Sequence, residues 1–257
     1  TITFEALTGR PVHDQLVAAG HALDHIRLPR EAHVIVVAPA TADFVARAAM
    51  GRADDLLTAS LLAAGDVPVL IVPSMNDRMW AHPQVQRNIV RLREVGYQVL
   101  DPEVGPLASR EEGSGPGRMP EPATIRAHVG RLLEPASSLR GKHVVVTAGP
   151  TREALDPVRF LSNHSTGKMG VAVAAAAWRR GAEVTLVAGP LGVELPVGPR
   201  VVSVESTQDM AEAVRHSLAN ADALVMAAAP ADFRAEQLAP QKIKKGASAP
   251  SLPLAVT

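Results

Sequence analysis

The sequence of 257 residues contains no cysteine. Without a thiol, the chain cannot form a disulfide, a thiolate metal site or a cysteine nucleophile. The sequence has 26 Lys and Arg residues and 26 Asp and Glu residues, so positive and negative charges are equal in number. A nucleic-acid surface needs an excess of basic residues, and a membrane span needs about 18 consecutive apolar residues, which this sequence lacks. We therefore expect neither nucleic acid nor a membrane as a partner.

The two ends of the sequence also lack recognisable signals. The chain begins at Thr1 without a methionine and without the basic and apolar regions of a signal peptide, and it ends abruptly at Thr257. These features predict a cytoplasmic protein that is a piece of a longer chain.

In the first half, short apolar runs alternate with amphipathic stretches. Strands are expected at 34–37, 67–72 and 97–100, and the stretches between them predict helices that include 83–94. This alternation is typical of a parallel sheet covered by helices. Residues 101–122 are rich in Gly, Pro and charge, and we expect them to form a long loop that serves as a lid.

The alternation restarts after a Pro- and Ser-rich stretch near residue 136. The expected strands are 143–148, 183–187, 201–204 and 223–226, and the expected helices are 167–180 and 208–218. We predict an α/β fold of two doubly wound, Rossmann-like three-layer modules, 1–135 and 136–257. The glycine turns at 148–150 and 188–190 follow two of these strands, so they are candidate walls of a ligand site.

Two residues of the first half are candidates for chemistry. Asn76 lies just beyond an expected buried strand, where its amide could donate to a carboxylate while Met75 and Met79 pack on a ring. The alternative is a helix cap next to ordinary core methionines. His25 could move a proton near neutral pH, or it could be a histidine without a role.

The second half has two polar stretches. In the first, hydroxyls, amides and glycines of 147–170 precede a helix and could present N–H groups to an anion; alternatively, Ser165 or Thr166 only caps that helix. The second runs from Asp232 to three lysines within 242–245. The lysines could neutralise a polyphosphate while Asp232 holds Mg²⁺ or a sugar hydroxyl, or they could form a solvated basic loop.

Together these segments resemble the bifunctional phosphopantothenoylcysteine decarboxylase/phosphopantothenate–cysteine ligase family of bacterial coenzyme A biosynthesis. Residues 39–43, Pro-Ala-Thr-Ala-Asp, resemble its PASANT-type flavin motif, and residues 73–80 match its PxMNxxMW pattern. Residues 147–153, 162–170 and 242–245 resemble its ligase signatures. The resemblance covers nearly the whole chain in order.

The resemblance implies a function for each half. Residues 1–135 would be an FMN-dependent decarboxylase domain that lacks its N-terminal strand, and 136–257 would be a ligase domain that is incomplete at its C-terminus. The ligase would use CTP and Mg²⁺ to join 4′-phosphopantothenate to cysteine, and the decarboxylase would convert the product to 4′-phosphopantetheine. The family also implies a homo-oligomer, a dodecamer of decarboxylase trimers joined by ligase dimers.

The resemblance also implies roles for single residues. His25 matches the active-site histidine, Asn76 the asparagine that binds the substrate carboxylate, and Asn163 the asparagine tied to the acyl-cytidylate. The remaining positions are Pro39, Ala40, Thr41 and Met75 for FMN, Ala228, Asp232 and Lys242 for the nucleotide, and Ser109, Arg118 and Met119 for the lid. No residue is assigned to a metal.

The sequence departs from the family at the lid, where Ser109 stands in place of a cysteine that helps to reduce an intermediate. A serine hydroxyl cannot take that redox role. Two alternatives follow: a ligase whose decarboxylase half is impaired, or a non-catalytic flavoprotein-like regulatory subunit. His25 and Asn76 together argue against the second, because a retired site has no reason to keep both.

Overall fold

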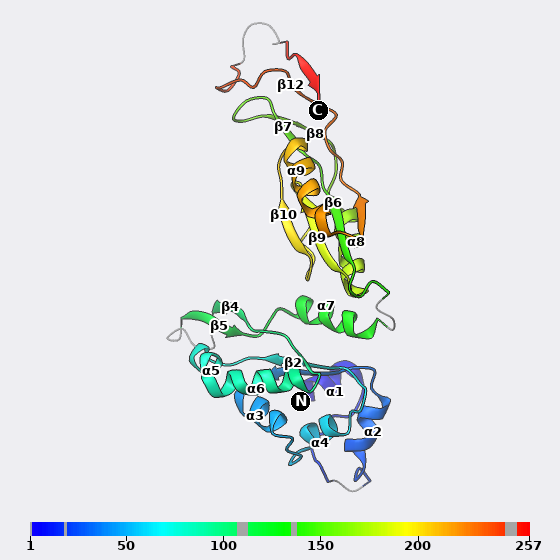
Figure 1. Ribbon diagram of the computed structural model, residues 1–257. Coiled ribbons are helices and arrows are strands. Elements are labelled where there is room, and N and C mark those ends of the chain that lie inside the picture. Colours follow the sequence, from blue (N-terminus) through cyan, green and yellow to red (C-terminus); the bar gives the residue numbers. More distant parts are fainter. Residues whose placement is uncertain (1, 18–19, 107–112, 135–137, 245–250) are drawn as a thin grey trace. The chain divides into compact units, whose positions relative to one another are not determined.

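The computed structural model describes residues 2–17, 20–106, 113–134, 138–244 and 251–257 (Figure 1). The chain divides into two compact units, Thr1–Leu133 and Glu134–Thr257. Each unit has its own parallel sheet, which confirms the predicted Rossmann-like α/β class. Among the described residues, no helix is long and apolar enough to cross a bilayer.

The first unit is built on the sheet β1 (Ile35–Ala40), β2 (Val69–Pro73) and β3 (Gln98–Val99), which pair in parallel in that order. All five residues of the central strand β2 are buried. The backbone N–H of Ser74 donates to the carbonyl of Ala40 at 3.0 Å. The carboxyl ends of β1 and β2 therefore lie side by side.

The helices of the first unit are α1 (Ile2–Thr8), α2 (Asp24–Glu31), α3 (Ala42–Ala49), α4 (Leu56–Leu62), α5 (Asp77–Ala81), α6 (Pro83–Glu94) and α7 (Pro122–Leu133). Helix α6 has the predicted bounds. The His82 side chain caps its start by accepting from the Gln84 N–H, and Pro83 occupies its first turn, where its missing N–H costs nothing. Its buried residues, Val85, Asn88, Ile89 and Leu92, recur at the spacing of one helix face.

The expectation of a long loop at 101–122 is wrong for its described part. Strands β4 (Glu103–Pro106) and β5 (Ser114–Arg118) form an antiparallel hairpin, and α7 begins at Pro122. Glycine and proline are disfavoured in strands, so composition indicated a loop. The glycines are needed for another reason: a Cβ on Gly117 would lie 2.1 Å from the carbonyl oxygen of Met75. Close packing therefore set the composition of this hairpin.

The second unit has a four-stranded parallel sheet in the order β10 (Arg200–Ser203), β9 (Glu183–Ala188), β6 (His143–Ala148) and β11 (Ala223–Met226). The chain winds outward from β6 to β10 and then returns to β11 on the other side of β6. The crossover helices α8 (Lys168–Arg179) and α9 (Thr207–Ser217) therefore cover opposite faces of the sheet. This is the predicted doubly wound arrangement, and its switch point lies between β6 and β11.

Shorter elements complete the second unit. They are the 3₁₀ turn η1 (Leu218–Asn220), the antiparallel pair β7 (Arg152–Ala154) and β8 (Phe160–Ser162), and the antiparallel pair β12 (Phe233–Ala235) and β13 (Leu254–Val256). Helix α8 packs very closely on β6, because a Cβ on Gly170 would lie 2.6 Å from the carbonyl oxygen of Thr147. The loop that follows β6 thus lies against the start of α8.

Candidate functional site

The first unit has a cavity of about 530 Å³ at the carboxyl end of β2. Its walls are the segment after β2 and the end of the β4–β5 hairpin, and its lining includes Met75, Asn76, Arg118 and Met119. The N–H of Met75 donates to the carbonyl of Gly117 at 3.0 Å, which fixes the hairpin on this segment. The structure thus brings together two pairs of predicted site residues, Met75 with Asn76 and Arg118 with Met119, which lie about 40 positions apart in the sequence. Ser109 lies outside the described residues.

Asn76 adopts the helix-cap alternative that its sequence position left open, and its donation to a carboxylate stays a prediction. It is the N-cap of α5, and its Oδ1 accepts from the backbone N–H of Arg78 at 2.9 Å. No described residue accepts a hydrogen bond from its Nδ2. The cap therefore fixes the amide through its oxygen and leaves its two N–H donors for a ligand in the cavity.

The residues predicted for FMN lie at the neighbouring end of β1. Ala40 is fully buried, Pro39 is exposed, and Thr41 caps α3 by accepting from the backbone N–H of Phe44 at 3.2 Å. The Ala40–Ser74 backbone bond joins this end of β1 to the segment that carries Met75. The N-terminus of α3 and the cavity are thus carried by adjacent strand ends.

His25 lies elsewhere in the first unit. It is in α2 and lines a separate cavity of about 530 Å³ with Leu16, Ala22, Ala59 and Leu62 among its neighbours. Its Nδ1 is buried and has no hydrogen-bond partner in the described part of the chain. Buried ring nitrogens are rarely left unpaired, so this atom needs a partner that the described residues do not provide. His25 does not line the cavity of Asn76.

In the second unit, three backbone hydrogen bonds to two threonine side chains hold the loop after β11. Thr147, at the end of β6, accepts from the N–H groups of Ala227 and Ala228 at 3.1 Å each. The N–H of Ala231 donates to Thr151 at 2.8 Å. Both threonines are buried. These contacts fix the backbone of the predicted nucleotide loop at the switch point, and Asp232 lies exposed at its end.

Asn163 also contacts this loop. Its Nδ2 donates to the carbonyl of Pro230 at 2.8 Å. Neither Ser165 nor Thr166 is the N-cap of α8: Gly167 holds that position, without a side-chain cap, and the helix begins at Lys168. Ser165 accepts from the N–H of Gly167 at 3.3 Å, and Thr166 from that of Lys168 at 3.4 Å. The start of α8 and the loop after β11 thus meet through Asn163.

Asp156 anchors the lysine segment, a role that the sequence did not reveal. Its buried carboxylate accepts from Val158 N at 2.8 Å, from Arg159 N at 2.9 Å and from Ile243 N at 3.0 Å. The Arg159 guanidinium donates to it at 2.7 and 3.0 Å and also to the carbonyl of Ile243 at 2.5 Å. Burial alone would raise the pKa of the Asp156 carboxyl. The hydrogen bonds from these donors lower the pKa by more than burial raises it, so the pKa lies well below the ordinary value.

The hydrogen bonds between Ile243 and both Asp156 and Arg159 also hold the backbone between two of the predicted lysines. Lys242 and Lys244 flank Ile243, and both are exposed. The bonds to Ile243 therefore fix the backbone between two ammonium groups that stay available to an anion. Lys245 lies outside the described residues.

Two family models match the chain. The model described as "Flavoprotein" covers residues 2–134, and the model described as "DNA/pantothenate metabolism flavoprotein C-terminal domain" covers residues 139–257. Each match falls on one of the two units.

Relatives that carry both parts are found among bacterial proteins. The chain is 50% identical over 253 residues to the coenzyme A biosynthesis bifunctional protein CoaBC of Mycobacterium tuberculosis, covering 96% of this chain and 60% of that protein. It is 44% identical over 246 residues to CoaBC of Vibrio vulnificus, covering 95% of this chain and 60% of that protein. The chain thus spans about 60% of the length of these relatives.

A solved structure titled as the FMN-dependent cysteine decarboxylase SpaF is similar to about half of the chain. The sequence identity is 36%, the match covers 51% of this chain and 69% of that one, and the TM-score is 0.41. The family assignment comes from the sequence matches, which cover both units.

Proposed function

The chain belongs to the flavoprotein family, and we propose that it acts in coenzyme A biosynthesis as the two domains of a CoaBC-type enzyme. In this proposal the first unit is an FMN-dependent phosphopantothenoylcysteine decarboxylase domain. The second unit is a phosphopantothenate–cysteine ligase domain that uses CTP and Mg²⁺. The partners are small molecules, and the proposal includes a cytoplasmic location and a dodecamer of decarboxylase trimers and ligase dimers.

The single observation that carries the decarboxylase is the arrangement of Asn76. Its Oδ1 is engaged by the Arg78 N–H, so its Nδ2 donors are left for the carboxylate of the substrate. Replacing water around that carboxylate with a neutral amide raises its energy relative to a CO₂-like transition state. Asn76 therefore binds the group that leaves and favours its departure.

The cavity has the size of a small-molecule site, and of the four residues predicted to hold FMN it is lined by Met75. A volume of about 530 Å³ is within the range of about 300–1,000 Å³ that is usual for small-molecule sites. Pro39, Ala40, Thr41 and Met75 would hold FMN at the adjacent ends of β1 and β2. When bound, FMN supplies the electron acceptor for oxidation of the cysteine thiol. Arg118 and Met119 would close the cavity from the hairpin.

His25 is proposed as the active-site histidine of this reaction. Support comes from its Nδ1, which is buried and unpartnered among the described residues, as expected of a group whose partner is a ligand. His25 and Asn76 line separate cavities of the first unit.

The ligase is supported by the anchored loops of the second unit. The pantothenate carboxylate attacks the α-phosphorus of CTP and releases pyrophosphate, and the amine of cysteine then displaces CMP from the acyl-cytidylate. Lys242 acts as a point charge on the phosphates. Ala228 and Asp232 lie on the loop that Thr147 and Thr151 hold, and Asn163 joins that loop to the start of α8.

The test uses 4′-phosphopantothenate, cysteine, CTP and Mg²⁺ with the FMN-loaded protein, and it follows products by mass spectrometry. We expect CMP, phosphopantothenoylcysteine and then 4′-phosphopantetheine. Failure to form any cytidylate would remove the ligase from the proposal. Supplying phosphopantothenoylcysteine directly tests the decarboxylase without relying on the ligase.

A second candidate is a ligase whose decarboxylase half is impaired. Ser109 favours it, because a serine cannot replace a thiol that reduces an intermediate. In that case CO₂ would be released but the reduced product would not form. Ser109→Cys would then restore 4′-phosphopantetheine, whereas an active decarboxylase would need no such change.

A further inference from the structure

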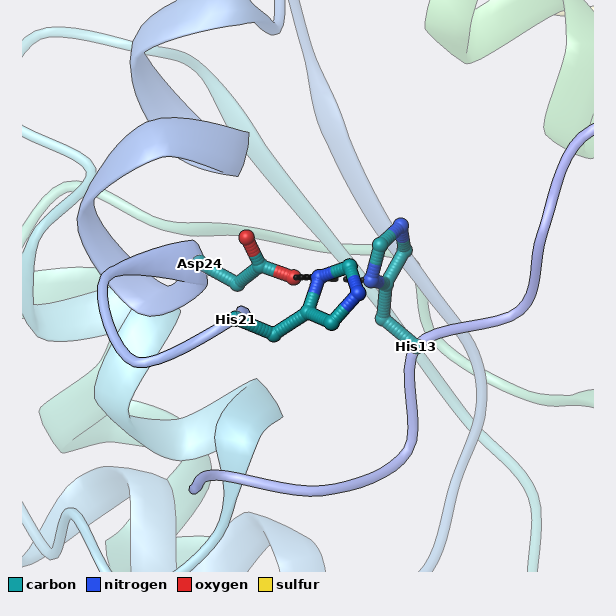
Figure 2. Close-up of side chains that lie close together, drawn as sticks. All are labelled: His13, His21 and Asp24. Carbon is teal, nitrogen blue, oxygen red and sulfur yellow. Dashed lines mark hydrogen bonds and ion pairs between the residues drawn. The ribbon is translucent and has the colours of Figure 1, made fainter. Parts of the chain in front are cut away.

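Two histidines converge on one buried carboxylate at the start of α2 (Figure 2). His13 Nδ1 lies 2.8 Å and His21 Nδ1 2.9 Å from the same oxygen, Oδ2 of Asp24. The two imidazole rings stand edge to face with their centroids 5.4 Å apart. The three side chains come from the segment that precedes α2 and from its first residue.

We propose that His13, His21 and Asp24 bind a transition-metal dication of the Zn²⁺ type and leave a further coordination position open. Two imidazole nitrogens and a carboxylate oxygen are a usual three-ligand set for zinc. One ligand atom from each residue lies within 4.8 Å of the other two. Bonds from zinc to nitrogen or oxygen are about 2.0–2.2 Å long, so three atoms at this spacing can surround one ion.

The second oxygen of Asp24 is already held. Arg27 donates to Oδ1 from Nη2 at 3.0 Å and from Nε at 3.2 Å. Such a contact orients a ligating carboxylate and is typical of the shell around metal sites. The charge of Arg27 is shared with Glu31, whose oxygens lie 3.2 and 3.3 Å from Nη1. Oδ2 thus remains directed at the two histidines.

The three side chains differ in exposure, so the site is polar at its base and accessible to an ion from solvent. The Asp24 side chain is 6% exposed, that of His13 22% and that of His21 50%. The carboxylate lies at the base, and His21 forms an open rim that an ion and a water or ligand can reach. A bound ion would tie the segment before α2 to the helix that carries His25.

Hydrogen bonding alone is the competing explanation. Without an ion, each Nδ1 carries a proton and donates a hydrogen bond to Oδ2 of Asp24. With an ion, each Nδ1 is a lone-pair ligand and its proton has left, to Nε2 or to water. The protonation of Nδ1 therefore distinguishes the two states.

The experiment titrates the metal-stripped 257-residue chain with Zn²⁺ against a chromophoric chelator. We expect one bound equivalent, lost in His13→Gln and in His21→Gln and kept in the control His33→Gln, an exposed histidine outside the cluster. Unchanged circular dichroism shows that the variants are folded. His21 is half exposed, so its replacement is well suited to this check.

A second measurement uses the imidazole ¹⁵N signals of the wild-type chain. Zinc should move the Nδ1 signals of two histidines to the range of coordinated nitrogen, and these signals should be absent from the two ligand variants. The proposal is overturned if the wild type takes up no Zn²⁺ at micromolar concentration, or if neither His13→Gln nor His21→Gln removes the bound equivalent.

Discussion

Thr147 shows how one hydroxyl can position a loop. It is 1% exposed at the end of β6, and its Oγ1 accepts from two successive backbone N–H groups, those of Ala227 and Ala228. We predict that Thr147→Val keeps the β-branched shape that suits the strand but leaves both donors without an acceptor. Leaving one buried donor without an acceptor costs about 1–3 kcal/mol. Because these two donors are only partly buried, we expect a total loss of about that size in the free energy of unfolding of the second unit.

The measurement is urea unfolding followed by Trp178 fluorescence in a chain whose other tryptophan, Trp80, is replaced by Phe. Thr185→Val is a matched control, since Thr185 is similarly buried on β9 but, among the described residues, its hydroxyl bonds only to the side chains of His143 and Arg200. Those side chains can turn to water, so the control should lose less stability. Equal losses for both variants would mean that the loop does not depend on Thr147.

At the scale of elements, the lysine segment depends on the anchor at Asp156. Its Oδ1 accepts two bonds and its Oδ2 accepts three. Asn has only one such oxygen, so Asp156→Asn must place an NH₂ group against at least two donors. We predict that this variant releases Ile243 and weakens binding of CTP, measured by calorimetry, and that adding Lys242→Gln weakens it little further.

The same variant gives a pH prediction. The pKa of Asp156 is lowered in the folded state, so its contribution to stability is complete above the ordinary aspartate pKa of about 3.9 and is lost as pH falls below it. The difference in urea midpoint between wild type and Asp156→Asn should therefore be present at pH 7 and smaller at pH 3.

Asp222→Asn is the control for nucleotide binding. Its carboxylate accepts from Lys142 Nζ and His143 N, both at 2.8 Å, at the amino end of β6. This end is opposite to the switch point, so the control should lose stability but keep its affinity for CTP. A loss of CTP affinity in the control as well would refute a specific role of the anchor.

Elements with clear local signals were predictable from sequence, and elements defined by packing were not. Helix α6 begins at a proline and buries one face, and β6 and β11 are short apolar runs, so their bounds follow from neighbours in the chain. The β4–β5 hairpin was missed because its glycines and prolines reflect contact with the Met75 segment. Helix α7, which was not among the expected helices, buries no residue fully.

The candidate sites divide in the same way. Asn76 was found because a strand end and a known pattern mark it, although only the structure shows that its cap leaves Nδ2 available. Thr147 and Asp156 act on residues 80 or more positions away. No local pattern reports such a contact, and it depends on the order of the strands in the sheet. The same holds for His13, whose partner Asp24 lies across a turn.

At the scale of the whole molecule, the two units are separate bodies with their own sheets and cores. The first unit packs Val37, Phe44, Ile71 and Ile89 within one cluster, and the second packs Val145, Val187 and Met210 in another. The residues proposed for each activity belong to a single unit.

This separation predicts that the two activities can be removed one at a time. Asn76→Ala deletes the amide that binds the substrate carboxylate, so we expect decarboxylation to be abolished while CTP-dependent ligation continues and phosphopantothenoylcysteine accumulates. Lys242→Gln is the converse variant: it should raise the apparent KM for CTP and leave decarboxylation of supplied phosphopantothenoylcysteine unchanged. Both activities are measured by mass spectrometry of the products, once with 4′-phosphopantothenate, cysteine and CTP and once with supplied phosphopantothenoylcysteine. If Asn76→Ala reduced both activities equally, the sites would be coupled, and the assignment of one reaction to each unit would be wrong.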